Sequence, residues 1–377
     1  MESPLGISLT SSGRCNTESV ADVRILVTGI CGFVGSQVAL GLRRRMPSAE
    51  ICGIDNLIRP GSHITRPALE RVRIHVRHGD VRCTSDFETL GDFDWVIDAA
   101  ANPSVLAGMD GRTSSRQLVE HNLLGTVNTL EFCRQRRAGL LLLSTSRVYS
   151  IDALSALPLT IVDEAFVPTD GTWPEGSSPE GLTEAFSTTA PISLYGATKL
   201  ASEALALEYG SAFELPVVVD RCGVIAGAGQ FGTAEQGVFS FWIGSWTARR
   251  SLAYLGFGGT GHQVRDALHP DDLAELVHLQ LGRGMAASGV WNVGGGRLRA
   301  LSLAQLSRWC RERVGDHSVR ADPTQRRWDV PWVVIDSRRA VDTFGWRPAR
   351  SLEAMLTDIA AHYSDHPEWL DLSRPDV

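Results

Sequence analysis

A tyrosine and a lysine four residues apart are the strongest chemical signal in the sequence, in the segment SLYGATKL at 193–200. Lys199 is the only lysine among the 36 lysine and arginine residues of the chain. On a helix, the Tyr195 phenol and the Lys199 ammonium lie on one face. A nearby cation favours the phenolate. The pair therefore predicts a tyrosine that transfers protons near neutral pH, which requires its pKa to fall by about 3 units from the ordinary value. A guanidinium at position 199 would be too broad for this role. Without the lysine, a helix tyrosine such as Tyr195 would be interpreted as a packing residue.

A hydroxyl at the end of an apolar run is the second candidate group. Thr145 closes the run GLLLLST at 139–145, which is typical of a buried strand. Ligands gather at the carboxyl ends of parallel strands, where this hydroxyl can bond the reacting oxygen of a substrate. The alternative for Thr145 is local capping of the backbone.

A glycine-rich turn indicates a dinucleotide site. The segment VTGICGFVG at 27–35 places Gly29, Gly32 and Gly35 between a predicted strand and a predicted helix, which suits a pyrophosphate at the helix N-terminus. Asp55 follows 20 residues after Gly35, where its carboxylate accepts from ribose hydroxyls and repels a 2′-phosphate. We therefore expect NAD as the cofactor, with Arg59 as a solvated loop residue rather than a ligand of NADP.

Alternating strands and helices must position these groups. The sequence predicts strands at 24–29, 50–56, 71–80, 94–100, 139–146 and 215–222, with helices at 35–45, 114–137 and 191–213. This order predicts an α/β fold, a doubly wound parallel Rossmann sheet with a smaller C-terminal α/β lobe. We expect a flexible tail at 1–22, a dinucleotide domain at 23–222 and a substrate lobe at 223–377 that returns segments to the sheet. Further helices are predicted near 270–284, 301–314 and 351–363.

Composition excludes several classes of protein. The net charge is -7 and the arginines are scattered, which argues against nucleic acid as a ligand. No apolar run approaches the length of a membrane span, so no membrane partner is expected. The seven cysteines form no CxxC pair, so neither a disulfide framework nor a metal site is predicted and a cytoplasmic location is expected. They lie at positions 15, 31, 52, 83, 133, 222 and 310.

Taken together, the motifs resemble the extended short-chain dehydrogenase/reductase superfamily, which acts mainly on nucleotide sugars. The resemblance spans about residues 23–365 and rests on TGICGFVG, HGDV, DAAAN, HNLLGT, STSRVY, YGATK, RDALHPDD and FGWRP. It implies a catalytic set of Thr145, Tyr195 and Lys199 with Asn122 as a structural and relay residue. It implies that Asp80 and Val81 touch adenine. Further contacts with the dinucleotide are implied for Phe33, Val34, Asn56, Ala99, Ala100, Ala101, Tyr195, Lys199 and Cys222.

Within that superfamily the chain is similar to the CDP-tyvelose (CDP-paratose) 2-epimerases. The shared segments are DNLIRPGS, QFGTAEQG, GHQVRDALH and WNVGGG. The resemblance implies a nucleoside-diphosphate sugar as substrate, contacted by Asn102, Ser104, Thr145, Gln230 and Gln236. Diphosphate clamps are implied at Arg265 and at Arg326 or Arg327, because guanidinium forks match phosphate oxygens.

The expected reaction is epimerisation at C2 of a CDP-hexose or related sugar through a transient keto-sugar. Dehydratases of the superfamily carry an Asp-Glu pair after the catalytic threonine, where this chain has Ser146 and Arg147. A 4-epimerase or a dehydrogenase acting on a similar sugar stays as the alternative. A non-enzymatic NAD-sensing protein is disfavoured by the intact catalytic set. A homodimer is expected through the helices at about 113–137 and 192–213.

Overall fold

One parallel sheet forms the centre of the described structure, as the alternating pattern predicts. The computed structural model describes residues 23–109, 111 and 114–373, so the predicted tail at 1–22 lies outside the described residues. The strands of the sheet are β1 Arg24–Thr28, β2 Glu50–Asp55, β3 His75–His78, β4 Trp95–Asp98, β5 Gly139–Thr145, β10 Val217–Cys222 and β14 Gly289–Val293. They follow the order β14-β10-β5-β4-β1-β2-β3, with every neighbouring pair parallel.

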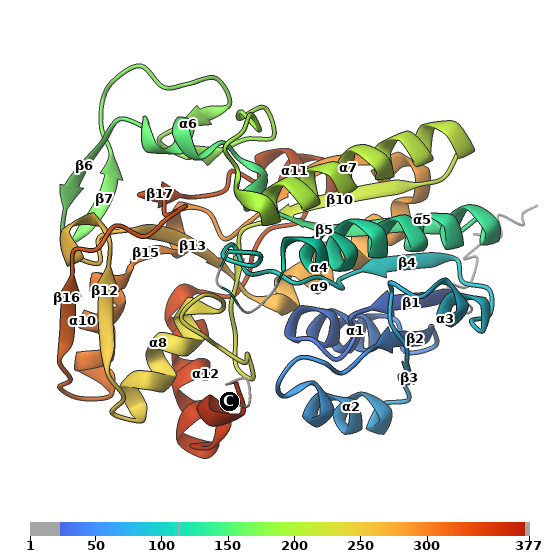
Figure 1. Cartoon of the computed structure of the whole chain (residues 1–377), viewed down its shortest axis with the longest axis horizontal. Coiled ribbons are helices and arrows are strands. Elements are labelled where there is room, and N and C mark those ends of the chain that lie inside the picture. Colours follow the sequence, from blue (N-terminus) through green and yellow to red (C-terminus); the bar gives the residue numbers. More distant parts are fainter. Residues whose placement is uncertain (1–22, 110, 112–113, 374–377) are drawn as a thin grey trace, which may run out of the picture.

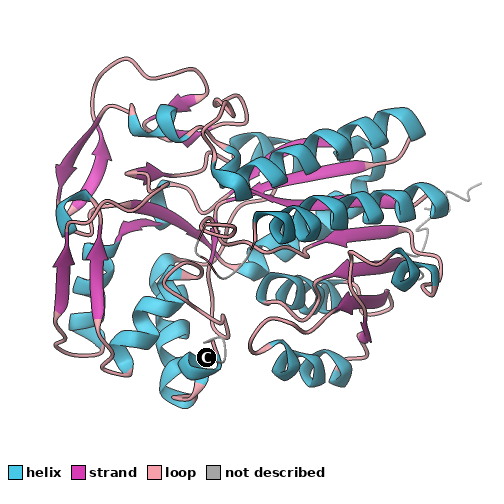
Figure 2. Cartoon of the chain, in the orientation of Figure 1, coloured by secondary structure: helices cyan, strands magenta, loops and turns pink. Residues whose placement is uncertain are grey.

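Helices cover both faces of the sheet, which confirms the doubly wound α/β fold (Figures 1 and 2). The two faces of β1 enter different cores: Ile25 and Val27 join one cluster and Leu26 joins the other. Successive strand residues point to opposite faces, so a strand buried on both sides reads as a continuous apolar run. The first core takes α1 Phe33–Arg45, α2 Ser62–Arg71, α9 Pro270–Arg283 and α11 Arg338–Phe344, and the second takes α3 Thr84–Glu88, α5 Gly125–Arg136 and α7 Ser193–Phe213.

The helix predicted at 114–137 is divided by a π-helical turn. Helix α4 spans Ser115–Val119, the π turn η1 spans Glu120–Leu124, and α5 continues from Gly125. A π turn inserts an extra residue into the helical repeat and often accompanies functional sites. The third strand also ends earlier than predicted, at His78 rather than Asp80.

The second half of the chain forms a smaller lobe around its own core. Three helices bury their apolar faces there, namely α8 Val238–Thr247, α10 Leu303–Arg313 and α12 Leu352–Asp365. A small sheet contains β11 Val224–Ile225, β13 Val264–Leu268, β15 Ala300–Ser302 and β17 Trp332–Val333. Strand β14 and helix α9 return to the central sheet, so the two halves interlock (Figure 1). The domain boundary at 222 and 223 stays a prediction.

The remaining elements are short. Paired strands are β12 Leu252–Leu255 with β16 Val319–Asp322, β6 Leu159–Val162 with β7 Ala165–Pro168, and β8 Ser177–Ser178 with β9 Gly181–Leu182. Short helices are α6 Ile151–Ser155, α13 Trp369–Leu372, η2 Ser146–Val148, η3 Phe257–Gly259, η4 Gly284–Ala287 and η5 Arg297–Arg299.

The described residues contain neither a membrane-spanning helix nor a metal-binding cluster. No helix within 23–109, 111 and 114–373 is long and apolar enough to cross a bilayer. No group of three or more His, Cys, Asp or Glu side chains in this part of the chain is arranged to hold a metal ion. The cysteines there, Cys31, Cys52, Cys83, Cys133, Cys222 and Cys310, are free thiols.

Candidate active site

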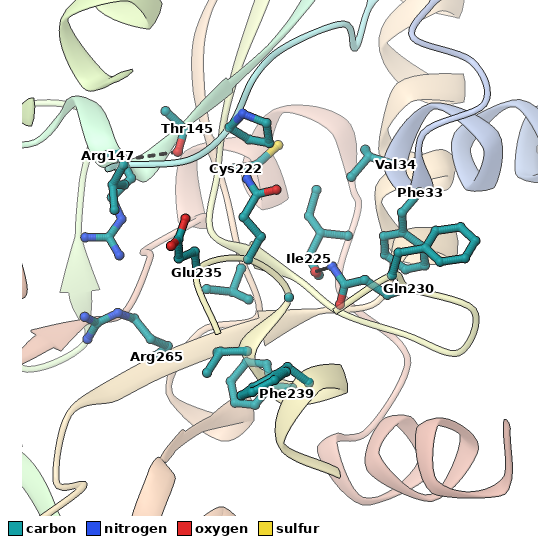
Figure 3. A pocket seen from close by; sticks show the side chains of 18 of the residues that line it. Phe33, Val34, Thr145, Arg147, Cys222, Ile225, Gln230, Glu235, Phe239 and Arg265 are labelled. Atoms are coloured by element: carbon teal, nitrogen blue, oxygen red, sulfur yellow. Dashed lines mark hydrogen bonds between the residues drawn. The ribbon is translucent and has the colours of Figure 1, made fainter. Parts of the chain in front are cut away.

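A cavity of about 390 Å³ lies where the carboxyl ends of the central strands face the smaller lobe. Strand β1 delivers the glycine turn to its wall, β5 delivers Thr145, and β10 delivers Cys222. The opposite wall comes from the 230–242 segment, β12, β13 and the loop before β17, including Arg265 (Figure 3). Because connected parallel strands end on the same edge, groups far apart in sequence meet in this cavity.

The glycine turn has no room for side chains. Gly29 has φ +63°, and a Cβ there would lie 2.8 Å from the Ala100 Cα. A Cβ on Gly35 would lie 2.4 Å from the Gly29 carbonyl oxygen. Helix α1 begins after Gly32 with no side-chain cap and no acidic residue in its first turn, so its first N–H groups face the cavity uncapped. This cradle fits a pyrophosphate, which needs free N–H donors and close backbone approach.

The acidic residue after β2 is fixed beside that turn. Asp55 accepts from the Cys31 N–H at 2.8 Å through one oxygen and from the Leu57 N–H at 2.8 Å through the other. Each carboxylate oxygen has a second lone pair, so the group can still accept from a ribose hydroxyl. The predicted position of Asp55 at the end of a strand is confirmed by β2.

A second acidic network lies further along the same sheet edge. Asp80 accepts from the Asn56 side-chain amide at 3.0 Å and from Arg82 at 2.6 Å. The Arg82 guanidinium and the Asn56 amide hold the pKa of Asp80 well below its usual range. Asp55, Asn56, Asp80, Val81 and Ala100 are not part of the described cavity wall. Their role toward the adenosine half of a dinucleotide stays a prediction.

The catalytic candidates lie together at the carboxyl end of β5. Tyr195 and Lys199 occupy α7 on one face, four residues apart, and both are buried, with 7% and 2% of their surfaces exposed. Tyr195 and Thr145 line the cavity. No hydrogen bond or ion pair among the described residues engages the Lys199 ammonium. Its donors are therefore free for a ligand.

Burial is the main influence on the pKa of Tyr195. Burial raises the pKa of Tyr195 to about 12, and a hydrogen bond with Thr145 and the charges of Arg147 and Arg59 oppose that rise. Desolvation of the phenolate thus outweighs these opposing contributions within the protein. The predicted acidification also counts on the positive nicotinamide ring of NAD, so it stays a prediction. Burial likewise lowers the pKa of Lys199, while the carboxylates of Asp98 and Glu203 act against the decrease.

Asn122 lies in the π turn and connects three segments. Its amide oxygen accepts from the Asn102 N–H at 2.7 Å, and its amide nitrogen donates to the Asn102 carbonyl at 3.0 Å and to the Thr198 hydroxyl at 3.1 Å. The side chain is buried and does not line the cavity. Asn122 therefore ties the loop after β4 to helix α7, next to Tyr195 and Lys199.

The substrate candidates separate into two groups. Gln230, Gln236, Arg265 and Arg326 line the cavity, whereas Asn102, Ser104 and Arg327 do not. Arg327 lies instead over the Trp328 ring, 4.8 Å from its centroid. Several of these side chains already have protein partners. For example, the Gln230 amide bonds the Ile225 carbonyl and the Ser240 hydroxyl, and Ser104 donates to Glu235 at 2.9 Å.

Four charged residues of the wall were not predicted as site residues. Arg59 donates to the Gln236 amide oxygen at 2.6 Å, and Glu235 faces the cavity. Arg147 follows Thr145 closely in sequence, which is a signal that a sequence reading can find. Asp329 carried no such signal, because only the fold brings it to Arg265, with which it forms an ion pair at 3.1 Å.

Known proteins resemble this chain in sequence. The sequence profile of the NAD dependent epimerase/dehydratase family matches residues 25–294. The chain is 27% identical over 342 residues to CDP-paratose 2-epimerase of Salmonella typhi, covering 86% of this chain and 95% of that protein. It is 28% identical over 366 residues to a dTDP-glucose 4,6-dehydratase of Streptomyces niveus, covering 94% and 97%.

A solved structure shows the same fold. The UDP-glucose 4-epimerase of Thermus thermophilus in complex with NAD superposes with a TM-score of 0.72 at 25% identity, over 91% of this chain and all of that chain. The glycine cradle and the position of Asp55 at the end of β2 fit a dinucleotide. With the profile matching most of the chain, this protein belongs to the NAD dependent epimerase/dehydratase family and is an enzyme whose cofactor is NAD.

Proposed function

We propose that the enzyme epimerises a nucleoside-diphosphate sugar without net oxidation, at C2 of a CDP-hexose or a related sugar. One observation carries the proposal: Thr145 and Tyr195 share a cavity with Arg265 and Arg326. A proton-transfer pair and guanidinium groups thus face one ligand space. The dehydratase relative suggests water elimination, but this chain has Ser146 and Arg147 where superfamily dehydratases carry an acid pair.

The residues of the chain have distinct roles in this reaction. Tyr195 accepts the proton of the sugar hydroxyl and later returns it, while the Thr145 hydroxyl bonds the same oxygen and holds it in place. When bound, oxidised NAD supplies a hydride acceptor and a positive ring that favours the phenolate, so that the sugar passes through a ketone. Lys199 donates to the ribose of the dinucleotide. Phe33 and Val34, which follow the glycine turn, and Cys222, which ends β10, also line the cavity.

Arg265 and Arg326 hold the diphosphate in this proposal. Burial lowers the pKa of Arg265 to about 10, and the Asp329 carboxylate opposes the decrease, so the guanidinium stays charged at neutral pH. Charge-assisted bonds from a guanidinium to phosphate oxygens are short and directional. Gln236 of the smaller lobe accepts from Arg59, which lies in the loop after β2, and both side chains line the cavity.

The choice of C2 and of a CDP-sugar rests on the 2-epimerase motifs and on the Salmonella relative. The alternative is a 4-epimerase, as in the Thermus structure. Purified enzyme is incubated with CDP-, UDP-, GDP- and ADP-hexoses, and the products are identified by proton NMR while absorbance at the NADH band is followed. We expect a C2 epimer and no net NADH. Steady accumulation of NADH without a second sugar would refute epimerisation.

We also propose a homodimer formed through the α4–α5 segment and α7. These elements contact each other and carry exposed apolar side chains, namely Val119, Leu124, Leu207 and Phe213. Placing charge at two of them, in the double variant Leu124→Glu and Leu207→Glu, should yield monomers in light-scattering chromatography while wild type elutes as a dimer. A wild-type monomer contradicts the proposal. The cytoplasmic location stays a prediction.

A further inference from the structure

Arg147 is a positively charged residue of the cavity wall with no role in the catalytic set of Thr145, Tyr195 and Lys199. Its backbone N–H donates to the Thr145 hydroxyl oxygen at 3.1 Å, and Figure 3 shows its guanidinium on the cavity side together with that of Arg265. The guanidinium makes one long hydrogen bond, to the Trp328 carbonyl at 3.4 Å. Among the described residues, no carboxylate lies within ion-pair distance of it. The Asp329 carboxylate acts on the charge of this guanidinium from beyond ion-pair distance, and the unused donors are available to a further anion.

Arg265, by contrast, is held by the protein. It pairs with Asp329 at 3.1 Å and donates to the carbonyls of Val264 and Val330 at 2.7 and 2.8 Å. The charges of Arg147 and Arg326 both depress the pKa of Arg265, so these three guanidinium groups lie near one another. Like charges that converge in a partly buried space repel each other unless an anion joins them.

The charge of the described cavity wall fits a diphosphate. Its cations are Arg59, Arg147, Arg265 and Arg326, and its carboxylates are Glu235 and Asp329. The surplus is therefore two positive charges. Arg265 and Arg326 come from the smaller lobe, whereas Arg147 comes from the sheet edge, two residues after Thr145. A diphosphate that meets all three therefore runs from the smaller lobe toward the catalytic edge.

We propose that Arg147 binds the phosphate bonded to the sugar and thereby selects C2 as the reacting carbon. The inference rests on the proposed function, because it assumes a nucleoside-diphosphate sugar whose ring lies at Thr145 and Tyr195. The sugar phosphate is bonded through oxygen to C1, and C2 is the neighbour of C1, whereas C4 lies across the ring. If this phosphate is bound beside Thr145, the C2 hydroxyl lies near the Tyr195 phenol. C4 is then farther from the phenol by about the width of the sugar ring.

The first test measures binding and needs no turnover. NAD-loaded wild type, Arg147→Met and Arg147→Lys are titrated calorimetrically with CDP and CMP, and with UDP and UMP. Because the monophosphates lack the second phosphate, Arg147→Met should weaken diphosphate binding about 10-fold or more and monophosphate binding less than about 2-fold. Arg147→Lys should recover part of the loss. Equal losses for diphosphate and monophosphate, or no loss for either, would overturn the phosphate contact.

A matched surface variant controls for lost charge. Arg283 is exposed at the end of α9, outside the described cavity wall, and Arg283→Met should leave both affinities as in wild type. Retained NAD content shows that each variant is folded. A diphosphate loss in Arg283→Met as large as that in Arg147→Met would refute a local role for Arg147.

The second test measures regiochemistry with the CDP-hexose that wild type converts. We expect Arg147→Met to lose C2 epimerisation by about 30-fold or more in kcat/KM, with a larger rise in KM than fall in kcat. A wild-type product epimerised at C4, combined with the diphosphate-selective loss, refutes the C2 function and the selection of C2 but leaves the phosphate contact standing. A C2 product with unchanged Arg147→Met kinetics refutes the selection alone.

Discussion

At the residue scale, the surroundings of position 199 favour a lysine over an arginine. It is buried in α7, with Asp98 and Glu203 acting to keep it charged against the effect of burial. Its Nζ has no partner among the described residues. The chain uses arginine everywhere else. A guanidinium is wider and planar, so a buried position shaped around a thin stem does not accept it without displacing neighbours.

Replacing this lysine should remove turnover. Lys199→Arg and Lys199→Met are expected to lower kcat by about 10² or more, which is the usual scale of a lost proton-transfer group. The measurement is steady-state conversion of the nucleotide sugar, with NAD content determined on denatured protein. If Lys199→Arg keeps NAD and turns over at the wild-type rate, the assignment of Lys199 fails.

Neighbouring arginines 326 and 327 should respond differently to the same substitution. Arg326 lines the cavity, whereas Arg327 lies over the Trp328 ring and outside the described cavity wall. Arg326→Met should raise KM about 10-fold, because a charge-assisted bond to phosphate is lost. Arg327→Met serves as the matched comparison and should change KM less than about 2-fold. The reverse order of effects contradicts the placement of the diphosphate.

At the scale of elements, the turn between β1 and α1 is determined by how closely two backbone segments approach. The missing side chain of Gly35 lets the first turn of α1 pack against the Gly29 carbonyl. The α4–α5 segment shows a different effect. Its π turn directs Asn122 to the loop after β4 and to α7, a contact between elements that no local spacing in the sequence announces.

Adding one methyl group to that turn should displace α1. Gly35→Ala is expected to destabilise the protein by about 1–3 kcal/mol and to abolish retention of NAD, since the new Cβ would meet the Gly29 oxygen at 2.4 Å. Gly282→Ala in α9 is the control, because a Cβ at this position would have no neighbour within 4 Å beyond its own helix backbone. This substitution should be neutral or stabilise the protein by up to about 1 kcal/mol. Denaturant unfolding distinguishes them. An NAD-binding Gly35→Ala protein of wild-type stability refutes the close approach.

At the scale of the whole molecule, a buried polar pair joins the two halves of the chain. Asp220 of β10 accepts from the Gln280 amide of α9 at 2.7 Å, and its other oxygen has no partner among the described residues. Burial raises the pKa of Asp220 to about 7, with Gln280 opposing the rise. The folded protein therefore keeps a proton that the unfolded chain releases near pH 4.

The raised pKa of Asp220 makes the free energy of unfolding depend on pH. Because the folded state binds more protons between about pH 4 and 7, the contribution of Asp220 is fully present below about pH 4 and is lost as pH rises through about 7. Asp220→Asn should remove this loss and stabilise the protein at pH 8 by up to about 4 kcal/mol relative to wild type. Urea unfolding at about pH 5 and 8 measures the difference, with exposed Asp170→Asn as the control. An equal gain at both pH values would contradict the titration.

The sequence by itself determined whatever depends on neighbours along the chain. The glycine turn with Asp55 after it, the four-residue spacing of Tyr195 and Lys199, and the strand ending at Thr145 are local patterns, because helix and strand periodicities repeat over a few residues. They were sufficient to predict the doubly wound sheet and the NAD site. Motifs that occur together along the chain added the family and its reaction class.

Only the tertiary structure decided the electrostatics of the cavity. It brought Asp329 to Arg265, placed Arg326 in the wall and Arg327 outside it, and buried the Tyr195 phenol so that its pKa rises to about 12. Desolvation and charge interactions depend on the distances and burial of groups from distant segments, and no spacing along a chain encodes these. The surplus of guanidinium groups beside Thr145 became visible only when both halves of the chain had folded around one cavity.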